Sequence, residues 1–338
     1  MELTNKQYDH LVEQISVTYE AGLRKVAVVA NQTMLATYWQ IGQYIVEFEQ
    51  EGREKATYGT ALLKRLSADL TLRHGRGFSH TNINYMRLFY LRYPILETVS
   101  PKLSWGLIFE LLKIDDPLER GFYEKQAVRE NWHVRELKRQ KKSMLFHRLA
   151  LSRDKEGILE LSQRGQSLEK PEDLLREPYV LDFLKIPEPY HFSESELEER
   201  IIVQLRQFLL ELGKGFAFVG QQYRVPLGNR DYRVDLVFYH RILKCFVLID
   251  LKKGEADYAD VGQMNMYLGY FEEEENTEGD NPPIGIVLAR EKDEMVVRYA
   301  MKNLNSNLFV TKYQLYLPNR EELQKKLEEI LGQEEEEE

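Results

Sequence analysis

The 338-residue chain has very little cysteine and no long apolar run. Its single cysteine, Cys245, excludes an intramolecular disulfide and leaves no cysteine cluster for zinc. The seven histidines are scattered, with neither HxH nor HExxH spacing, so a zinc site is not expected. No stretch approaches the roughly 18 apolar residues of a membrane span, and the N-terminus lacks the basic start and apolar stretch of a signal peptide. We therefore expect a cytoplasmic protein.

Charge is distributed unevenly along the chain, whose formal net charge is −9. Residues 1–150 contain 22 Lys and Arg against 17 Asp and Glu, whereas residues 151–338 contain 24 against 38. The acidic excess includes the runs 272–275 and 334–338, which are typical of solvated loops and tails. Net charge therefore does not exclude a polyanionic partner for the first half of the chain.

Hydrophobic periodicity predicts that residues 1–150 form an all-α domain. Apolar residues recur three and four positions apart over 31–42 and 62–70, as on the buried face of a helix. A further helix is predicted from a cap at Ser79 to about Tyr93, where Pro94 ends it. Two more helical stretches follow, at 105–113 and 117–149.

The second half of the chain has a different pattern. Residues 151–190 are polar and punctuated by proline, and we take them as a connection to a domain at 191–332, which an acidic tail at 333–338 follows. Ser195 and Glu198 have the spacing of a helix capping box. Beyond this helix we predict strands at 216–226, 231–239 and 243–251, a helix at 257–272, a strand at 284–289, a helix at 291–304 and a strand at 308–316. The order α-β-β-β-α-β-α-β favours an α/β fold with a mixed sheet flanked by helices.

The strand at 243–251 runs directly into the most informative motif of the sequence. Asp250 and Lys252 are two residues apart, so on a strand their side chains share one face. If this strand pairs with its predecessor through a turn at 240–242, Asp235 comes close to Asp250. Burying two carboxylates together is costly, and a bound divalent cation relieves the cost. An ion pair at a strand end is the alternative interpretation, because Asp-x-Lys alone is a weak pattern.

These residues carry a resemblance to a known superfamily. Asp235 followed by Asp250-Leu251-Lys252 resembles the PD-(D/E)xK nuclease signature, and the predicted element order resembles that superfamily's restriction-endonuclease-like core. More narrowly, segments 208–220, 235–239 and 262–267 resemble the YhcG-like proteins, predicted nucleases of that superfamily. In the first half, Tyr38-Trp39-Gln40-Ile41-Gly42 and Gly77-Phe78-Ser79 resemble the family's N-terminal helical domain. The resemblance implies that this domain is winged-helix-like and binds DNA.

The resemblance also implies roles for the motif residues. Asp235 and Asp250 would ligate Mg²⁺ or Mn²⁺, with the backbone carbonyl of Leu251 as a further ligand. Lys252 would orient the attacking water and stabilise developing negative charge.

Two further positions match polar residues that the superfamily places near the metal. Gln263 matches a glutamine on the following helix, and an ordinary polar helix residue is the alternative. Glu198 matches the acid of the first helix, with Glu199 as the alternative choice. A helix-capping carboxylate would equally explain Glu198.

Residues 70–96 contain no acidic side chain and several basic ones. A helix after a Gly-rich turn resembles a recognition helix, whose side chains could contact phosphates and base edges. The candidate nucleic-acid-binding residues are Arg73, Arg76, Asn82, Asn84, Arg87 and Arg92.

The sequence thus predicts a cytoplasmic, Mg²⁺-dependent DNA endonuclease, with Mn²⁺ able to substitute. One alternative is a non-cleaving nucleic-acid-binding or assembly protein that retains a nuclease fold, and another is a nuclease that acts on RNA. A homodimer is also expected from the resemblance, because many nucleases of the superfamily dimerise to cut two strands.

Overall fold

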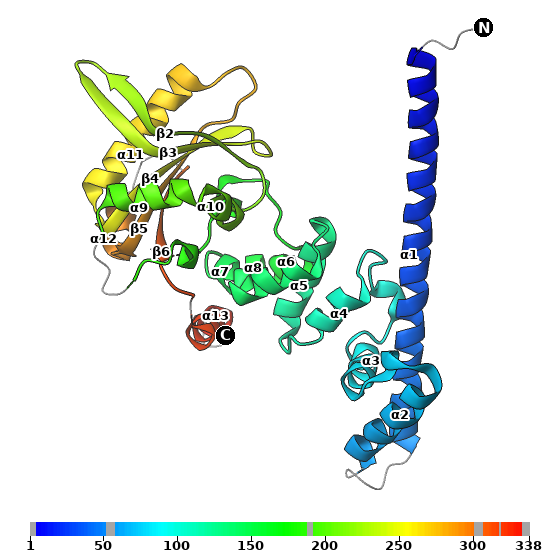
Figure 1. The fold of residues 1–338 in the computed structure, drawn as a ribbon. Helices are drawn as coiled ribbons and strands as arrows, with labels where there is room; N and C mark the ends of the chain where they lie inside the picture. Colours follow the sequence, from blue (N-terminus) through cyan, green and yellow to red (C-terminus); the bar gives the residue numbers. More distant parts are fainter. Residues whose placement is uncertain (1–4, 52–57, 188–191, 301–306, 318, 333–338) are drawn as a thin grey trace. The chain divides into compact units, whose positions relative to one another are not determined.

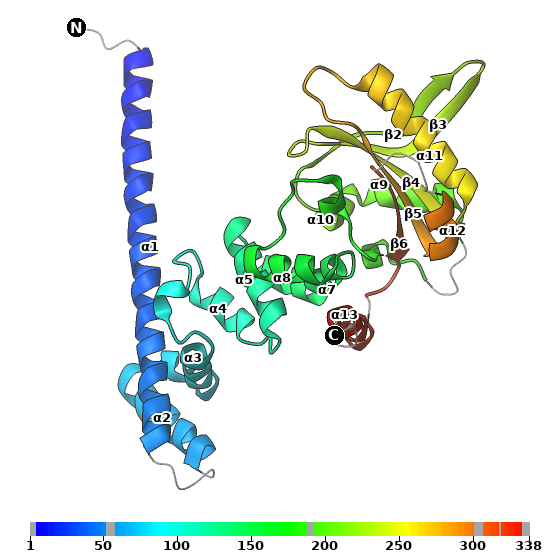
Figure 2. The same ribbon diagram turned by 180° about the vertical axis from the view of Figure 1, so that it is seen from behind.

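The computed structural model describes residues 5–51, 58–187, 192–300, 307–317 and 319–332, in two compact units (Figures 1 and 2). The units are Met1–Lys138 and Arg139–Glu338. The acidic tail predicted at 333–338 lies outside the described residues, as do the last four residues of the helix predicted at 291–304.

Unit 1 is helical, as the sequence predicts. It contains α1 (Asn5–Glu51), α2 (Tyr58–His74), α3 (His80–Arg92), α4 (Trp105–Leu111), α5 (Pro117–Arg129) and the first part of α6 (Val134–Lys142). No strand occurs among the described residues of this unit, so the β-hairpin that would make a winged helix is not seen in them. None of the helices in the described part of the chain has the length and apolar character needed to cross a bilayer.

A close approach of two helices holds unit 1 together. A Cβ atom on Gly42 of α1 would lie 2.1 Å from the carbonyl oxygen of Met86 on α3, so only glycine lets these backbones come so near. The Trp39 indole donates a hydrogen bond of 2.7 Å to the carbonyl of Tyr93, at the end of α3. The packed part of α1 is its C-terminal half, because residues 8–30 are all exposed.

Unit 2 is built on a six-stranded mixed sheet, which confirms the predicted fold class. The strand order is β1-β6-β5-β4-β3-β2; β2, β3 and β4 pair antiparallel, and β4, β5, β6 and β1 pair parallel. The strands are β1 (Tyr179–Val180), β2 (Phe216–Leu227), β3 (Arg230–His240), β4 (Cys245–Ala256), β5 (Ile284–Lys292) and β6 (Leu308–Gln314).

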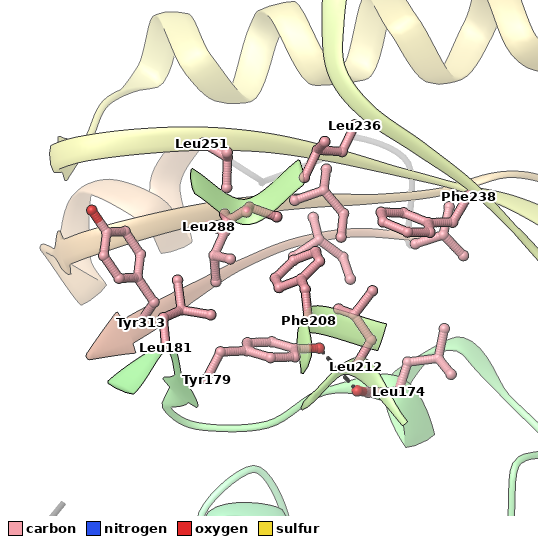
Figure 3. Packing of buried hydrophobic residues seen from close by; sticks show 14 of the residues in the cluster. Leu174, Tyr179, Leu181, Phe208, Leu212, Leu236, Phe238, Leu251, Leu288 and Tyr313 are labelled. Atoms are coloured by element: carbon pink, nitrogen blue, oxygen red, sulfur yellow. Dashed lines mark hydrogen bonds between the residues drawn. The ribbon is translucent and has the colours of Figure 1, made fainter. Parts of the chain in front are cut away.

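Helices cover both faces of this sheet. On one face, Phe208 and Leu212 of α10 (Leu205–Leu212) pack against Leu236 and Phe238 (Figure 3). α9 (Glu194–Val203) joins the same core, and α11 (Tyr258–Tyr270) packs on a second core with Val237, Leu248 and Val287. Other α-helices among the described residues of the unit are α7 (Leu145–Ala150), α8 (Lys155–Arg164), α12 (Glu294–Ala300) and α13 (Arg320–Gly332).

Several element boundaries differ from the prediction. The capping box of α9 is formed by Ser193 and Glu196, two residues before the predicted pair, because the Glu196 carboxylate accepts a 2.7 Å hydrogen bond from the Ser193 backbone amide. The helix predicted over 117–149 is three helices, α5, α6 and α7. The segment 151–190 contains α8 and the edge strand β1, and α13 was not predicted at all.

Candidate active site

The central strands β3 and β4 place two aspartates opposite one another. Leu236 pairs with Ile249, and the next position along the hairpin brings Asp235 across from Asp250. The Leu251 backbone amide donates a 2.7 Å hydrogen bond to Asp235 Oδ2. The Asp235 carboxylate thereby accepts a hydrogen bond that a backbone carbonyl of β3 would otherwise accept. This bond holds the Asp235 side chain against β4, the strand that contains Asp250.

Lys252 lies beside the same aspartate. Its Nζ is 2.9 Å from Asp250 Oδ2 and 3.1 Å from Asp260 Oδ1. Asp260 is in the first turn of α11, where its other carboxylate oxygen accepts a 3.0 Å hydrogen bond from the Asp257 backbone amide. Asp260 was not predicted from the sequence, because its position depends on how α11 docks on the sheet.

Gln222 on β2 connects two of the acidic residues. Its side-chain amide donates hydrogen bonds of 2.6 Å to Glu198 Oε2 and 3.0 Å to Asp235 Oδ1. Glu198 is buried on α9, whereas the alternative, Glu199, is exposed. The structure therefore places Glu198 at this cluster. Gln222 was not predicted either, although counting residues across the β2–β3 hairpin places it opposite Asp235.

Crowding of the carboxylates changes their ionisation. Burial and the neighbouring Asp235 raise the pKa of Asp250 to about 7, although Lys252 partly opposes the rise. Burial also raises the pKa of Asp235 and of Glu198 above their ordinary values. Burial alone would lower the pKa of Lys252, but the Asp250 and Asp260 carboxylates raise it, so the amine keeps its proton.

The predicted residue Gln263 is held by a neighbour on its own helix. Its side-chain amide hydrogen-bonds the hydroxyl of Tyr267, which in turn donates a 2.8 Å hydrogen bond to the carbonyl oxygen of Arg233. Tyr267 is fully buried, and its pKa is raised by burial and by the charge of Asp250. Gln263 thus lies near the cluster, but within the described residues its bond is to Tyr267 rather than to either aspartate.

The cluster offers the oxygen donors that a hard divalent cation prefers. Among the described residues no three His, Cys, Asp or Glu side chains are arranged to hold a metal by themselves. Asp250 Oδ2, however, is buried and has no hydrogen-bond partner within the described chain; its close contact is the ion pair with Lys252. Mg²⁺ commonly uses one or two carboxylates and retains several waters, so Asp235, Asp250 and the Leu251 carbonyl are a sufficient donor set.

The comparisons with known proteins agree with this architecture. The YhcG PDDEXK nuclease domain matches residues 172–328, and the DUF1016 N-terminal domain matches residues 14–148. "Putative nuclease YhcG" of Escherichia coli (strain K12) is 38% identical over 95% of this chain and 93% of its own length. The chain belongs to the YhcG family. Both the family resemblance and the PD-(D/E)xK-type fold predicted from the sequence are confirmed.

Solved structures show a more distant likeness to this YhcG-family chain. A repair endonuclease from Pyrococcus abyssi is 22% identical, covers 39% of this chain and 50% of its own, and has a TM-score of 0.26. A structure of EndoMS in complex with double-stranded DNA is also 22% identical, covers 40% of this chain and 51% of its own, and has a TM-score of 0.28.

Two of the predicted DNA-binding arginines of the YhcG-family chain are engaged within unit 1. Arg87 Nε is 2.6 Å from a carboxylate oxygen of Glu49 on α1. Arg92 donates a 2.8 Å hydrogen bond to the carbonyl of Ile114 and pairs with Asp115 at 2.5 Å. Both guanidinium groups therefore join α3 to neighbouring segments of the unit.

The remaining predicted DNA-binding residues differ in their exposure and hydrogen bonding. Asn82 is bound at both ends of its amide, because it accepts a 2.9 Å hydrogen bond from the Trp105 indole and donates one to a backbone carbonyl. Arg73 and Arg76 are exposed, and Asn84 is partly buried. Of the predicted set, Arg73 and Arg76 are the exposed residues.

Proposed function

We propose that this YhcG-family chain is a divalent-metal-dependent endonuclease that hydrolyses DNA phosphodiester bonds. The observation that carries the proposal is the juxtaposition of Asp235 and Asp250 on paired strands, with Lys252 2.9 Å from the Asp250 carboxylate. An ion pair that only stabilised the fold would need one carboxylate. Here Lys252 contacts two, and a third, Asp235, lies across the hairpin.

Each group has a distinct part in the proposed reaction. Asp235, Asp250 and the Leu251 carbonyl would hold the cation, which when bound lowers the pKa of a water and offsets charge on the scissile phosphate. Lys252 keeps its proton beside two carboxylates, so it presents a positive charge to a phosphate oxygen and can orient the attacking water. Glu198 and Gln222 would fix the position of Asp235.

The proposed substrate is DNA and the proposed cation is Mg²⁺, with Mn²⁺ as a substitute. In this proposal residues 1–150 bind DNA, and residues 191–332 carry out hydrolysis. The excess of basic over acidic residues in 1–150 and the exposed Arg73 and Arg76 support DNA binding by the first of these regions. Cleavage of RNA and binding without cleavage are separate outcomes of the experiment below.

The test uses purified full-length protein with supercoiled plasmid, single-stranded DNA and RNA, each in Mg²⁺, Mn²⁺ or EDTA. We expect nicking or linearisation of DNA in either metal and none in EDTA. Asp250→Asn and Lys252→Met should lower the rate by roughly 100-fold or more, and Glu199→Gln, which changes an exposed carboxylate of α9, should cleave like the wild type. Equal cleavage by wild type and Asp250→Asn would indicate a contaminating nuclease, and DNA binding without cleavage in any metal would favour a non-cleaving protein.

A further inference from the structure

The N-terminal half of α1 is a helix that no other described residue of unit 1 covers. Every residue from 8 to 30 is exposed, and Asn31 is the first α1 residue with a hydrogen bond to another element, a 2.8 Å bond to the Leu103 carbonyl. In Figure 1 this part of α1 continues beyond the other helices of its unit. Large apolar side chains are nevertheless frequent there, with 44% to 68% exposure: Tyr8, Leu11, Val12, Ile15, Val17, Tyr19, Leu23, Val26, Val28 and Val29.

Such a segment is not expected to be stable alone. Isolated helices are marginal in water even with favourable sequences, and most helical stability in proteins comes from packing of an apolar face. Contiguous exposed apolar surface of this kind marks an interaction site. A partner that covers the segment is therefore required.

The spacing of the apolar residues indicates another helix as that partner. Tyr8, Val12, Ile15, Tyr19, Gly22, Val26 and Val29 recur at alternating intervals of four and three residues. This is the seven-residue repeat of a left-handed coiled coil, in which positions a and d face the partner helix. The repeat extends over about three heptads and places Val17 and Val28 away from the seam.

The charges of the segment exclude polyanionic partners. Residues 6–30 contain three basic and three acidic side chains, so the helix has no net attraction for nucleic acid or for an anionic membrane surface. The charges are also segregated. Residues 6–20 contain Asp9, Glu13 and Glu20 against one lysine, whereas residues 21–30 contain Arg24 and Lys25 and no acid.

We infer that residues 8–30 of α1 pair with the same segment of a second copy of the chain, as an antiparallel coiled coil. In this orientation the acidic half of each helix lies beside the basic half of the other, whereas a parallel pair would place like charges together. The interface is then isologous, with a twofold axis near the middle of the segment. This inference goes beyond the proposed function and does not depend on it, because it concerns assembly rather than catalysis.

The first experiment measures the mass of full-length protein by analytical ultracentrifugation over a range of concentrations. The wild type should be a dimer, and Val12→Glu or Val26→Glu should raise the dissociation constant by roughly 100-fold, because a charge would be buried in the seam. Matched controls are Val17→Glu and Val28→Glu, the same change at exposed positions off the seam. A monomeric wild type, or equal dissociation constants for seam and control variants, would overturn the inference.

A second experiment tests orientation by oxidative cross-linking. The only native cysteine, Cys245, is buried in unit 2, so a single introduced cysteine reports on α1 alone. Because position a of one helix packs against position d of the other in an antiparallel pair, Ile15→Cys should cross-link to Tyr19→Cys when the two variants are mixed and reassociated. Tyr8→Cys should not cross-link to its own copy, but should cross-link to Val26→Cys in the same way. Self-cross-linking of Tyr8→Cys, with no product in the mixture, would refute the antiparallel arrangement.

Discussion

Gln222 and Asp235 lie opposite each other on β2 and β3, and the Gln222 amide donates to both Asp235 and Glu198. Two carboxylates that share one hydrogen-bond donor would otherwise repel each other. The neutral Gln222 amide lies between them and donates a hydrogen bond to one oxygen of each carboxylate. The other oxygen of Asp235, Oδ2, accepts a hydrogen bond from the Leu251 backbone amide. The glutamine therefore fixes the orientation of a proposed metal ligand without adding charge.

Replacement of this glutamine should weaken metal binding more than it weakens the fold. We expect Gln222→Ala to raise the Mn²⁺ concentration needed for half-maximal cleavage by about 10-fold or more. Loss of a side chain that hydrogen-bonds a metal ligand usually lowers metal affinity by this amount. Gln221→Ala is the matched control, because Gln221 is the exposed neighbour on the same strand. Metal titrations of the cleavage rate, with melting temperatures alongside, check the prediction. Identical titrations for the two variants would show that Gln222 has no such part.

Glu198 and Glu199 provide a matched pair on α9. Glu198 accepts the Gln222 hydrogen bond and is buried, whereas Glu199 is exposed. Glu198→Gln should lower the cleavage rate by about 10-fold to 100-fold, because a neutral amide would replace the negatively charged carboxylate that accepts the Gln222 hydrogen bond. Glu199→Gln should leave the rate unchanged. A larger loss in Glu199→Gln than in Glu198→Gln, measured in the same assay, contradicts this placement.

The raised pKa of Asp250 makes stability depend on pH in the absence of metal. Its pKa is about 7 in the folded protein against about 3.9 in an unfolded chain, so between these values the folded state binds more protons. Stability from this group is therefore lost as pH rises from about 4 to 7. Asp250→Asn removes the penalty and should be more stable than wild type at pH 8 by about 1–4 kcal/mol in EDTA, while Lys252 keeps Asp260 as its partner.

Denaturant unfolding at pH 5 and pH 8 measures this difference. Asp231→Asn is the control, because Asp231 is an exposed carboxylate on the same hairpin, paired with Arg224 at 2.9 Å. The stabilisation by Asp250→Asn should shrink at pH 5. A difference that is the same at both pH values would contradict the assignment of the effect to ionisation of Asp250.

Metal binding should have the opposite pH dependence. A cation binds the ionised carboxylate, so its binding competes with the proton on Asp250. We expect the apparent affinity for Mn²⁺, measured from thermal stabilisation without nucleic acid, to fall by about 10-fold for each pH unit below 7. Asp250→Asn should show little stabilisation by Mn²⁺ at any pH. Equal stabilisation of variant and wild type would place the metal elsewhere.

The arginines of unit 1 should separate into binding and structural groups. Arg73→Ala with Arg76→Ala should weaken DNA binding and lower the slope of log affinity against log salt by about 2, since both side chains are exposed. Arg87→Ala should instead lower stability, because it leaves the largely buried Glu49 unpaired. Fluorescence anisotropy from 50 to 200 mM salt and thermal melts distinguish the effects, with the exposed Arg65→Ala as control. An unchanged salt slope in the double variant would remove these arginines from the interface.

Local patterns were enough to predict the fold class and the proximity of Asp235 and Asp250. Both aspartates lie in strands joined by a short turn, so register follows from counting residues along one hairpin. The two-residue strand β1 has no periodicity to detect, and its partner β6 lies more than 100 residues further along the chain. No local signal could have placed it in the sheet.

Residues that depend on tertiary packing were not predictable in the same way. Asp260 reaches Lys252 only because α11 docks with its first turn beside β4. Arg87 looked like a phosphate-binding residue because its partner, Glu49, is 38 positions away in sequence. A helix surface that lacks acidic neighbours in sequence can still be neutralised by an acid from another helix.

The pairing of β1 with β6 has a consequence for any attempt to shorten the protein. A fragment that begins at residue 191 would retain every proposed catalytic side chain yet lose β1. β6 would then become the outermost strand, with an uncovered row of backbone donors and acceptors. Exposed strand edges of this kind template intermolecular pairing, so poor solubility of such a fragment would reflect a missing neighbour of β6 rather than a defect in the nuclease core.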